Sequence, residues 1–259
     1  MGAACDGDDD ATTSTQGVSG TVALGEIPEP LSDRPEPSVP PNLVADGTTT
    51  TTTTEPEVVP IDGPIGEVAD GDRLLIIGDR VLASTAPRFG GIACDVLPGF
   101  GWTVEIAAEP GRFIEFGDEV LDELLDPAAG DDWDVVVVML GNLFDGDLAG
   151  FEDDLTGLVE RISPRPMIVF TLTEVDDEAE LNDLIRALPD EYPNVVVIDW
   201  AELSAAEPDV LLEDGGPLVT EEGSGRLVLF MAAALGDAPG FGEGECLDPT
   251  FTDDSAIVL

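Results

Sequence analysis

Apolar residues follow one another in short runs along the middle of the chain, and polar segments separate these runs. The clearest are residues 135–140 and 195–198, which are aliphatic without interruption. Such runs are typical of strands covered on both faces, as in parallel sheets. The pattern predicts strands at 73–77, 103–106, 134–140, 167–171 and 194–198.

Amphipathic segments lie between the predicted strands and repeat apolar residues at helical spacing. They span residues 113–125, 151–162, 179–188 and 221–235. Strands that alternate with helices indicate a parallel sheet between two helical layers. The predicted fold class is therefore α/β, a three-layer α/β/α sandwich with a five-stranded parallel sheet.

The two ends of the chain have a different composition. Residues 1–70 contain Pro-Glu-Pro repeats and a threonine run from Thr48 to Thr54, so they bury too little apolar surface to fold. We expect a disordered acidic stalk at 1–70, a domain at 71–238 and an irregular tail at 239–259. No segment reaches the roughly 20 apolar residues of a transmembrane helix.

Charge and histidine content narrow the possible functions. The chain has 56 acidic and 9 basic residues, a net charge of −47, and no histidine. This charge disfavours nucleic acid and anionic lipid surfaces as partners. The lack of histidine excludes Ser-His and Cys-His catalytic pairs and His-ligated metals, so we expect no cofactor and no metal.

Three cysteines bear on location. Small residues precede Cys5, and an acidic stretch follows it, as at the end of a bacterial lipoprotein signal, although the apolar region is missing. Either the start lies too late or the likeness is accidental. A lipid on Cys5 would be the only membrane attachment, and it would place the protein extracellularly, at the cell envelope. Cys94 and Cys246 would then remain as an even pair, whose disulfide would tie the tail to the domain.

The segment 74–89 is the centre of the functional interpretation. It has an aliphatic run, a turn at Gly78-Asp79-Arg80 and a small-residue segment that can be helical. Open α/β proteins place their ligands outside the carboxyl ends of the strands, at such a turn. A nucleophile is expected there, but the position holds Arg80.

Four blocks carry a resemblance to the SGNH (GDSL) hydrolase superfamily, over residues 72–235. They are 75–80 (Leu-Ile-Ile-Gly-Asp-Arg), 111–112, 141–143, and 199–200 together with 213–223. The chain is most similar to exported actinobacterial and acyltransferase-associated members. The resemblance implies a flavodoxin-like sandwich and ester hydrolysis by a serine.

The catalytic positions of that family are occupied by other residues. The resemblance assigns the serine to Arg80, a backbone oxyanion donor to Gly111 and the asparagine donor to Leu143, with Asn142 as its displaced neighbour. An ungapped match of the last block puts Gly215 at the aspartate and Leu218 at the histidine. Anchoring on Asp214 instead puts Pro217 at the histidine.

We therefore expect no catalytic residue and an inactive module that binds an envelope glycan or a protein. The alternatives are an SGNH-type esterase with a non-standard site and a structural surface role. Ser84 lacks a histidine to activate it. The acidic residues at 145–147 and 152–154 lack the spacing of a calcium loop.

The candidate ligand pocket consists of Asp79, Arg80, Asn142 and Asp214. Arg80 would either pair with Asp79, Asp214 or Glu213, or present a fork of donors to a carboxylate, uronate or phosphate. Asp79 and Asp214 could also form an acid–base pair.

Overall fold

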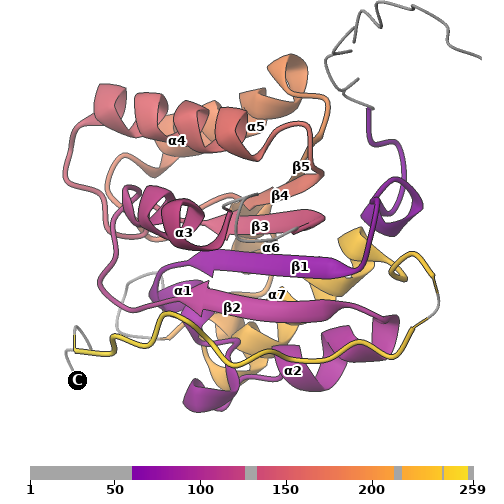
Figure 1. Ribbon diagram of the computed structural model, residues 1–259. Coiled ribbons are helices and arrows are strands. Elements are labelled where there is room, and N and C mark those ends of the chain that lie inside the picture. Colours follow the sequence, from indigo (N-terminus) through magenta and orange to yellow (C-terminus); the bar gives the residue numbers. More distant parts are fainter. Residues whose placement is uncertain (1–59, 126–132, 213–217, 241, 256–259) are drawn as a thin grey trace, which may run out of the picture. The chain divides into compact units, whose positions relative to one another are not determined.

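The computed structural model describes residues 60–125, 133–212, 218–240 and 242–255 of the 259-residue chain. Its centre is a sheet of five parallel strands in the order β2-β1-β3-β4-β5 (Figure 1). The strands are β1 (Arg73–Gly78), β2 (Thr103–Ala108), β3 (Val135–Met139), β4 (Met167–Phe170) and β5 (Val195–Ile198). The predicted α/β sandwich is confirmed.

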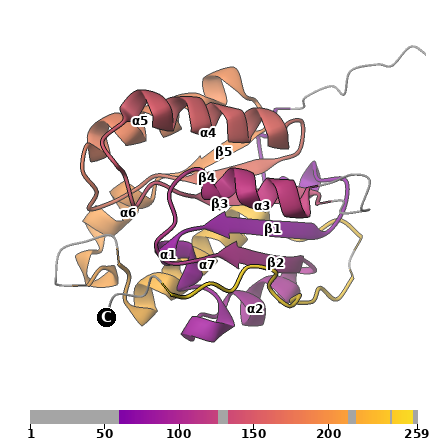
Figure 2. The same ribbon diagram turned by 60° about the vertical axis from the view of Figure 1, so that its left-hand side comes forward.

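Helices cover both faces of the sheet (Figures 1 and 2). On one face α3 packs on α4 and α4 on α5, and on the other α7 contacts α1 and α2. The α-helices are α1 (Arg80–Ala83), α2 (Ala93–Val96), α3 (Phe116–Leu124), α4 (Leu148–Ile162), α5 (Glu178–Glu191), α6 (Trp200–Ala206) and α7 (Glu221–Leu235). Short 3-10 helices are η1 (Ile65–Glu67), η2 (Pro87–Phe89), η3 (Leu97–Phe100) and η4 (Pro208–Val210).

Polar side chains fix where several helices begin. Asp147 accepts from Gly150 N at 3.1 Å at the start of α4, and Thr220 accepts from Gly223 N at 3.1 Å at the start of α7. Both satisfy an amide that the helix itself leaves free. The helix predicted from residue 113 starts later, because Phe113 follows a turn with Gly111 at φ 79° and is 46% exposed.

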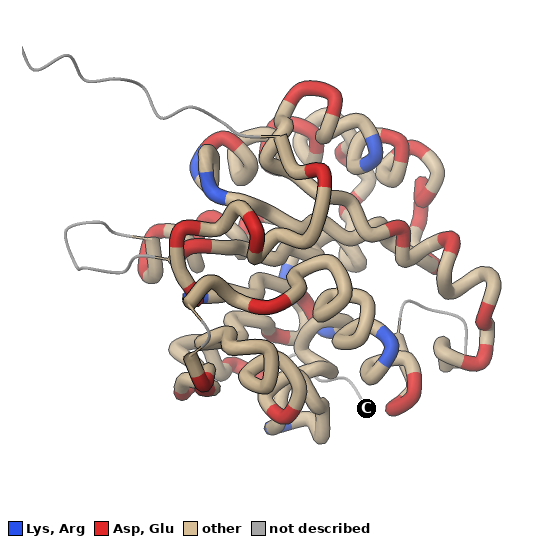
Figure 3. Tube along the Cα trace, turned by 90° about the vertical axis from the view of Figure 1, so that its right-hand side faces the viewer, with Lys and Arg blue, Asp and Glu red and all other residues tan. Residues whose placement is uncertain are grey.

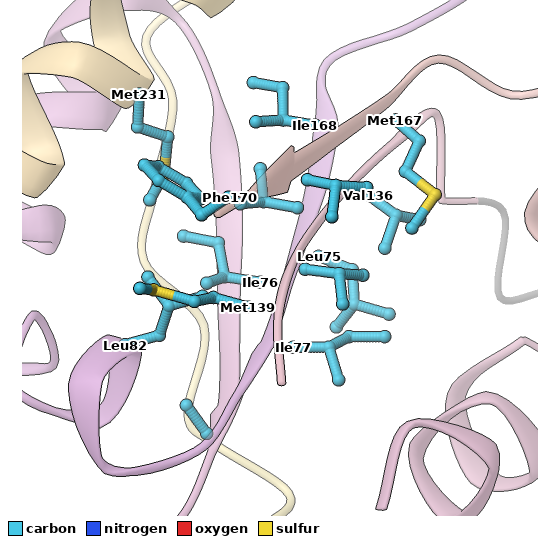
Figure 4. Close-up of a cluster of buried hydrophobic side chains, with 14 of the residues drawn as sticks. Leu75, Ile76, Ile77, Leu82, Val136, Met139, Met167, Ile168, Phe170 and Met231 are labelled. Carbon is cyan, nitrogen blue, oxygen red and sulfur yellow. The ribbon is translucent and has the colours of Figure 1, made fainter. Parts of the chain in front are cut away.

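The core forms on both faces of the sheet because strand side chains alternate in direction. Figure 4 shows Ile76, Met139 and Phe170 on the face that meets Leu82 of α1 and Met231 of α7. Leu75, Ile77, Val136 and Met167 point to the opposite face (Figure 4). Strands β1 and β3 are buried almost throughout, as their aliphatic runs predict.

The packed part of the chain begins before the predicted boundary at residue 71. Ile65 in η1 is fully buried, and η1 contacts α7. A side chain at Gly66 would overlap the carbonyl oxygen of Asp237, so the two segments lie in close contact. The rest of the predicted stalk, including Cys5, lies at 1–59, outside the described residues.

The tail runs beside the edge strand β2 (Figure 1). Val104 N donates to Glu245 O and Leu247 N donates to Val104 O, both at 2.8 Å. The predicted disulfide between Cys94 and Cys246 is present and joins this segment to α2. Residues 242–255 contain no helix or strand, yet they satisfy polar groups on an edge that would otherwise be open.

Acidic residues are spread over helices and loops, whereas arginines are few (Figure 3). Among the described residues, no helix is both long enough and apolar enough to cross a membrane.

Candidate functional site

The strand order reverses direction between β1 and β3, which lie side by side although β2 comes between them in the chain. At such a switch point the loops leave the sheet to opposite sides, and ligands bind outside the carboxyl ends of the strands. The turns after Gly78 and Met139 meet at this place. Gly78 is required there, because a Cβ atom would lie 2.6 Å from the side chain of Leu82.

Asp79 connects these two turns. It caps α1 by accepting from Val81 N at 3.0 Å, and its other oxygen accepts from Asn142 N at 3.1 Å. The Asn142 side-chain nitrogen donates to both carboxylate oxygens, at 3.0 and 2.9 Å. Asp79 is fully buried and Asn142 is 7% exposed. These two candidate pocket residues therefore bind each other and hold the ends of β1 and β3 together.

The environment of Asp79 changes its acidity. Burial raises the pKa of this carboxyl from 3.8 to about 6, since the charged form loses its water. The hydrogen bonds from Val81 and Asn142 and the positive charge of Arg80 act in the opposite direction. Asp79 is thus a group that titrates close to neutral pH at the centre of the site.

Arg80 follows directly and is half-buried. Its Nε is buried and has no hydrogen-bond partner among the described residues. The ion pairs found in those residues do not include one between Arg80 and Asp79. Asp214 and Glu213, the other proposed partners, lie outside the described residues.

The remaining family positions carry no reactive group. Gly111 has φ 79° in the turn after β2, a conformation that favours glycine. Leu143 is half-buried and lines a cavity of 190 Å³ between the starts of α3 and α4. Leu218 is half-buried and its carbonyl accepts from Leu212 N at 2.9 Å. Gly215 and Pro217 lie outside the described residues.

Comparison with known proteins gives a consistent result at the level of the fold. No protein-family model and no curated protein matches the chain. A putative SGNH hydrolase from Slackia heliotrinireducens is 16% identical, with a TM-score of 0.51 over 64% of this chain and 100% of that one. The C-terminal catalytic domain of Streptococcus pneumoniae peptidoglycan O-acetyltransferase A is 19% identical, with a TM-score of 0.50 over 64% and 93%. The esterase EstA from Pseudoalteromonas sp. is 13% identical, with a TM-score of 0.50 over 63% and 96%.

The chain has the fold of the SGNH hydrolases. At these identities the likeness concerns the fold, and activity depends on the residues that occupy the site.

The other candidate catalytic groups have structural partners in this domain. Ser84 Oγ donates to Val81 O at 2.6 Å, a contact within its own turn. Asp145 accepts from Asp147 N at 2.9 Å, and Asp147 caps α4, so two of the clustered acids organise a loop. Within the described ranges, no group of three or more acidic or cysteine side chains could hold a metal ion.

One polar cluster was not foreseen from the sequence. Glu109, at the end of β2, is 1% exposed and accepts from Arg112 Nε at 2.7 Å and from the backbone N of Asp253. The three-residue spacing of Glu109 and Arg112 was visible in the sequence. The contribution of Asp253 depends on the course of the tail, which the sequence pattern does not indicate.

Proposed function

We propose that this chain is a catalytically inactive SGNH hydrolase-like module that binds a ligand at the cell envelope, through the turn that carries Arg80. The residue at the nucleophile position carries this proposal. Arg80 stands directly after Asp79 at the end of β1, where the family resemblance places a serine. A guanidinium stays protonated in proteins and is neither a nucleophile nor a base.

The other parts of an acyl-transfer site are also missing. In a Ser-His site a histidine takes the proton of the attacking hydroxyl. The 259-residue sequence contains no histidine. The Asn142 side-chain amide, the displaced candidate for an oxyanion donor, is bound to Asp79 instead. These features support binding in place of catalysis.

Arg80 determines the chemistry of the proposed ligand. A planar guanidinium whose buried Nε has no partner in the part of the chain that the structure describes suits a carboxylate or a phosphate, which can accept two parallel hydrogen bonds. Envelope glycans that contain uronic acids or phosphate carry such groups. A protein that presents an acidic side chain is the second kind of partner.

Calorimetric titration with glucuronate tests whether the Arg80 site binds a carboxylate. Glucose is the control, because it has the same ring without the negative charge. We expect glucuronate to bind, glucose not to bind, and Arg80→Met to abolish binding. Arg226→Met is the control variant, because Arg226 pairs with Glu207 at 3.0 Å in a partly exposed position on α7. Undiminished binding by Arg80→Met, or no binding to the wild type at high glucuronate concentration, would refute the role of Arg80.

An ester assay tests the loss of catalysis. We expect wild type and Arg80→Ser to hydrolyse p-nitrophenyl acetate and acetylated sugars at the background rate, because a serine without a base remains a weak nucleophile. Turnover by the wild type above background would establish the alternative, an esterase with a non-standard site.

The envelope location rests on the sequence around Cys5. Mass spectrometry of the membrane fraction tests it, since a lipid on Cys5 adds the mass of its acyl chains. An unmodified Cys5 in a protein recovered only from the cytosol would overturn this part of the proposal.

A further inference from the structure

A cavity of 310 Å³ lies between the tail and the domain, away from the turn of Arg80. The disulfide of Cys94 and Cys246 forms part of its wall. The other lining residues come from the segment after α1, from β2 and from the tail: Ala86, Pro87, Arg88, Ile106, Leu247, Asp248 and Pro249. Most of these are apolar, and the volume is at the lower end of the range for small-molecule sites, about 300 Å³.

Arg88 is the cationic group in this apolar wall. Its Nη2 donates to Ala108 O at the end of β2, and its Nε lies 3.4 Å from Asp254 Oδ1. Its Nε and Nη1 are both buried and have no hydrogen-bond partner within the described residues, so the contact of Nε with Asp254 is an ion pair without a hydrogen bond. A buried donor without an acceptor is unfavourable, and a ligand that supplies an acceptor removes this penalty.

The charges around Arg88 determine the kind of acceptor. Asp254 already balances the guanidinium, and Asp248 adds a further negative charge to the wall. An anionic ligand would also have to approach a chain with a net charge of −47. A neutral carbonyl oxygen offers the missing acceptor without this repulsion.

We propose that the cavity is a binding site for a small neutral amphipathic molecule, such as an amide, ester or ketone. Its carbonyl oxygen accepts from Arg88 Nη1, and its alkyl or cyclic body lies against Ile106 and Leu247. The site requires the tail to be in place, because the tail contributes Leu247, Asp248 and Pro249. It is separate from the Arg80 site and independent of the function proposed there.

Nuclear magnetic resonance titration of the full oxidised chain tests this site with three six-carbon probes. Hexanamide offers a neutral acceptor, hexanoate an anionic one, and hexylammonium no acceptor. We expect hexanamide to bind most tightly and to shift the amide signals of Ala86, Cys94, Ile106 and Leu247. Equal binding of hexylammonium at these residues, or no shift with hexanamide, would contradict the proposal.

Variants separate the site from the fold. Arg88→Met should weaken hexanamide binding by about tenfold or more, the effect of one hydrogen bond to a charged group. Arg88→Lys should weaken hexanamide binding to a similar degree. Because the lysine keeps a positive charge next to Asp254, the tail should stay in place in this variant. Ala86→Leu should abolish binding by filling the cavity. Arg80→Met and Arg226→Met should leave binding unchanged, and a loss in either would place the probe elsewhere.

Discussion

Asp79 is the residue on which the centre of the site depends. Its carboxylate joins the start of α1 to the turn after β3, and it lies out of reach of solvent. The raised pKa means that the folded state binds the Asp79 proton more tightly than the unfolded chain does. Its contribution to stability is therefore fully present below pH 3.8 and is lost as the pH rises through about 6.

The variant Asp79→Asn tests this dependence. Between pH 4 and pH 7 the free energy of unfolding of the wild type should fall by about 2 kcal/mol more than that of the variant, because most of a shift of about two pKa units, worth 1.36 kcal/mol each, is lost in this range. Urea unfolding at several pH values measures the difference between the two profiles. Parallel profiles would show that Asp79 does not titrate in this range.

The hydrogen bonds from Asn142 to Asp79 lead to a second prediction about a single residue. Asn142→Ala removes the side-chain donor from a buried carboxylate, so it should lower the free energy of unfolding at pH 7 by about 1.5–3 kcal/mol. At pH 4 the loss should be smaller, because Asp79 is then protonated. Asn194→Ala is the matched control: Asn194 is equally buried but donates to the neutral carbonyl of Arg165, so its effect should not change with pH.

The residue identities alone showed that Arg80 stands where the resemblance expects a serine and that the sequence contains no histidine. They did not indicate that Asn142 binds Asp79. These residues are 63 positions apart, and only the pairing of β1 with β3 brings them together.

At the scale of elements, the tail and β2 form one unit. Thr250 N donates to Glu105 Oε1 at 3.0 Å, and Phe251 packs edge-on against Phe116 of α3, with ring centroids 5.3 Å apart. The tail therefore covers the edge of the sheet and reaches the helical layer on the side of α3. An uncovered edge strand offers free backbone groups to another chain.

Removal of residues 242–259 should expose β2 and cause self-association. Analytical ultracentrifugation of the truncated chain should detect oligomers that the full chain does not form. The double variant Cys94→Ser/Cys246→Ser keeps the segment but removes the covalent link without leaving a free thiol at either position, and it should keep the association state of the full chain. A monomeric truncated chain would show that β2 needs no cover.

The elements themselves were largely predictable. The five strands and the helix at 221–235 follow directly from aliphatic runs and helical spacing. A strand buried on both faces needs consecutive apolar residues, and a helix buried on one side needs apolar residues at helical spacing. Short helices such as α2 and α6 were not predicted, since one or two turns are too short for a period to show. Phe113 was wrongly placed in a helix because its apolar character was counted without the preceding turn.

At the scale of the whole molecule, the disulfide closes a large part of the chain into a loop. Cys94 and Cys246 are 152 residues apart. The double variant Cys94→Ser/Cys246→Ser should lower the free energy of unfolding by about 2–5 kcal/mol, as the unfolded chain regains freedom. Denaturant unfolding measures this loss, and a loss below about 1 kcal/mol would mean that the contacts of the tail hold without the link.

The net charge of −47 acts on the whole chain. Repulsion between carboxylates favours expanded states, and salt reduces the reach of this repulsion to about 10 Å at 0.1 M ionic strength. The midpoint of thermal unfolding should therefore rise when sodium chloride is increased. Calorimetry at several concentrations measures it, and a midpoint that falls would show that local ion pairs such as Arg161 with Asp118 contribute more than the repulsion.

The sequence by itself determined which segments form strands, the class of fold and the lack of histidine in these 259 residues. These properties depend on which residue types occur and on their local period. Tertiary structure alone decided the strand order, the pairing of Asp79 with Asn142 and the course of the tail along β2, where Thr250 meets a side chain 145 residues away. Such contacts depend on the path of the chain in space. The spacing of apolar residues in a sequence indicates which side chains are buried, but it does not indicate which residues they contact.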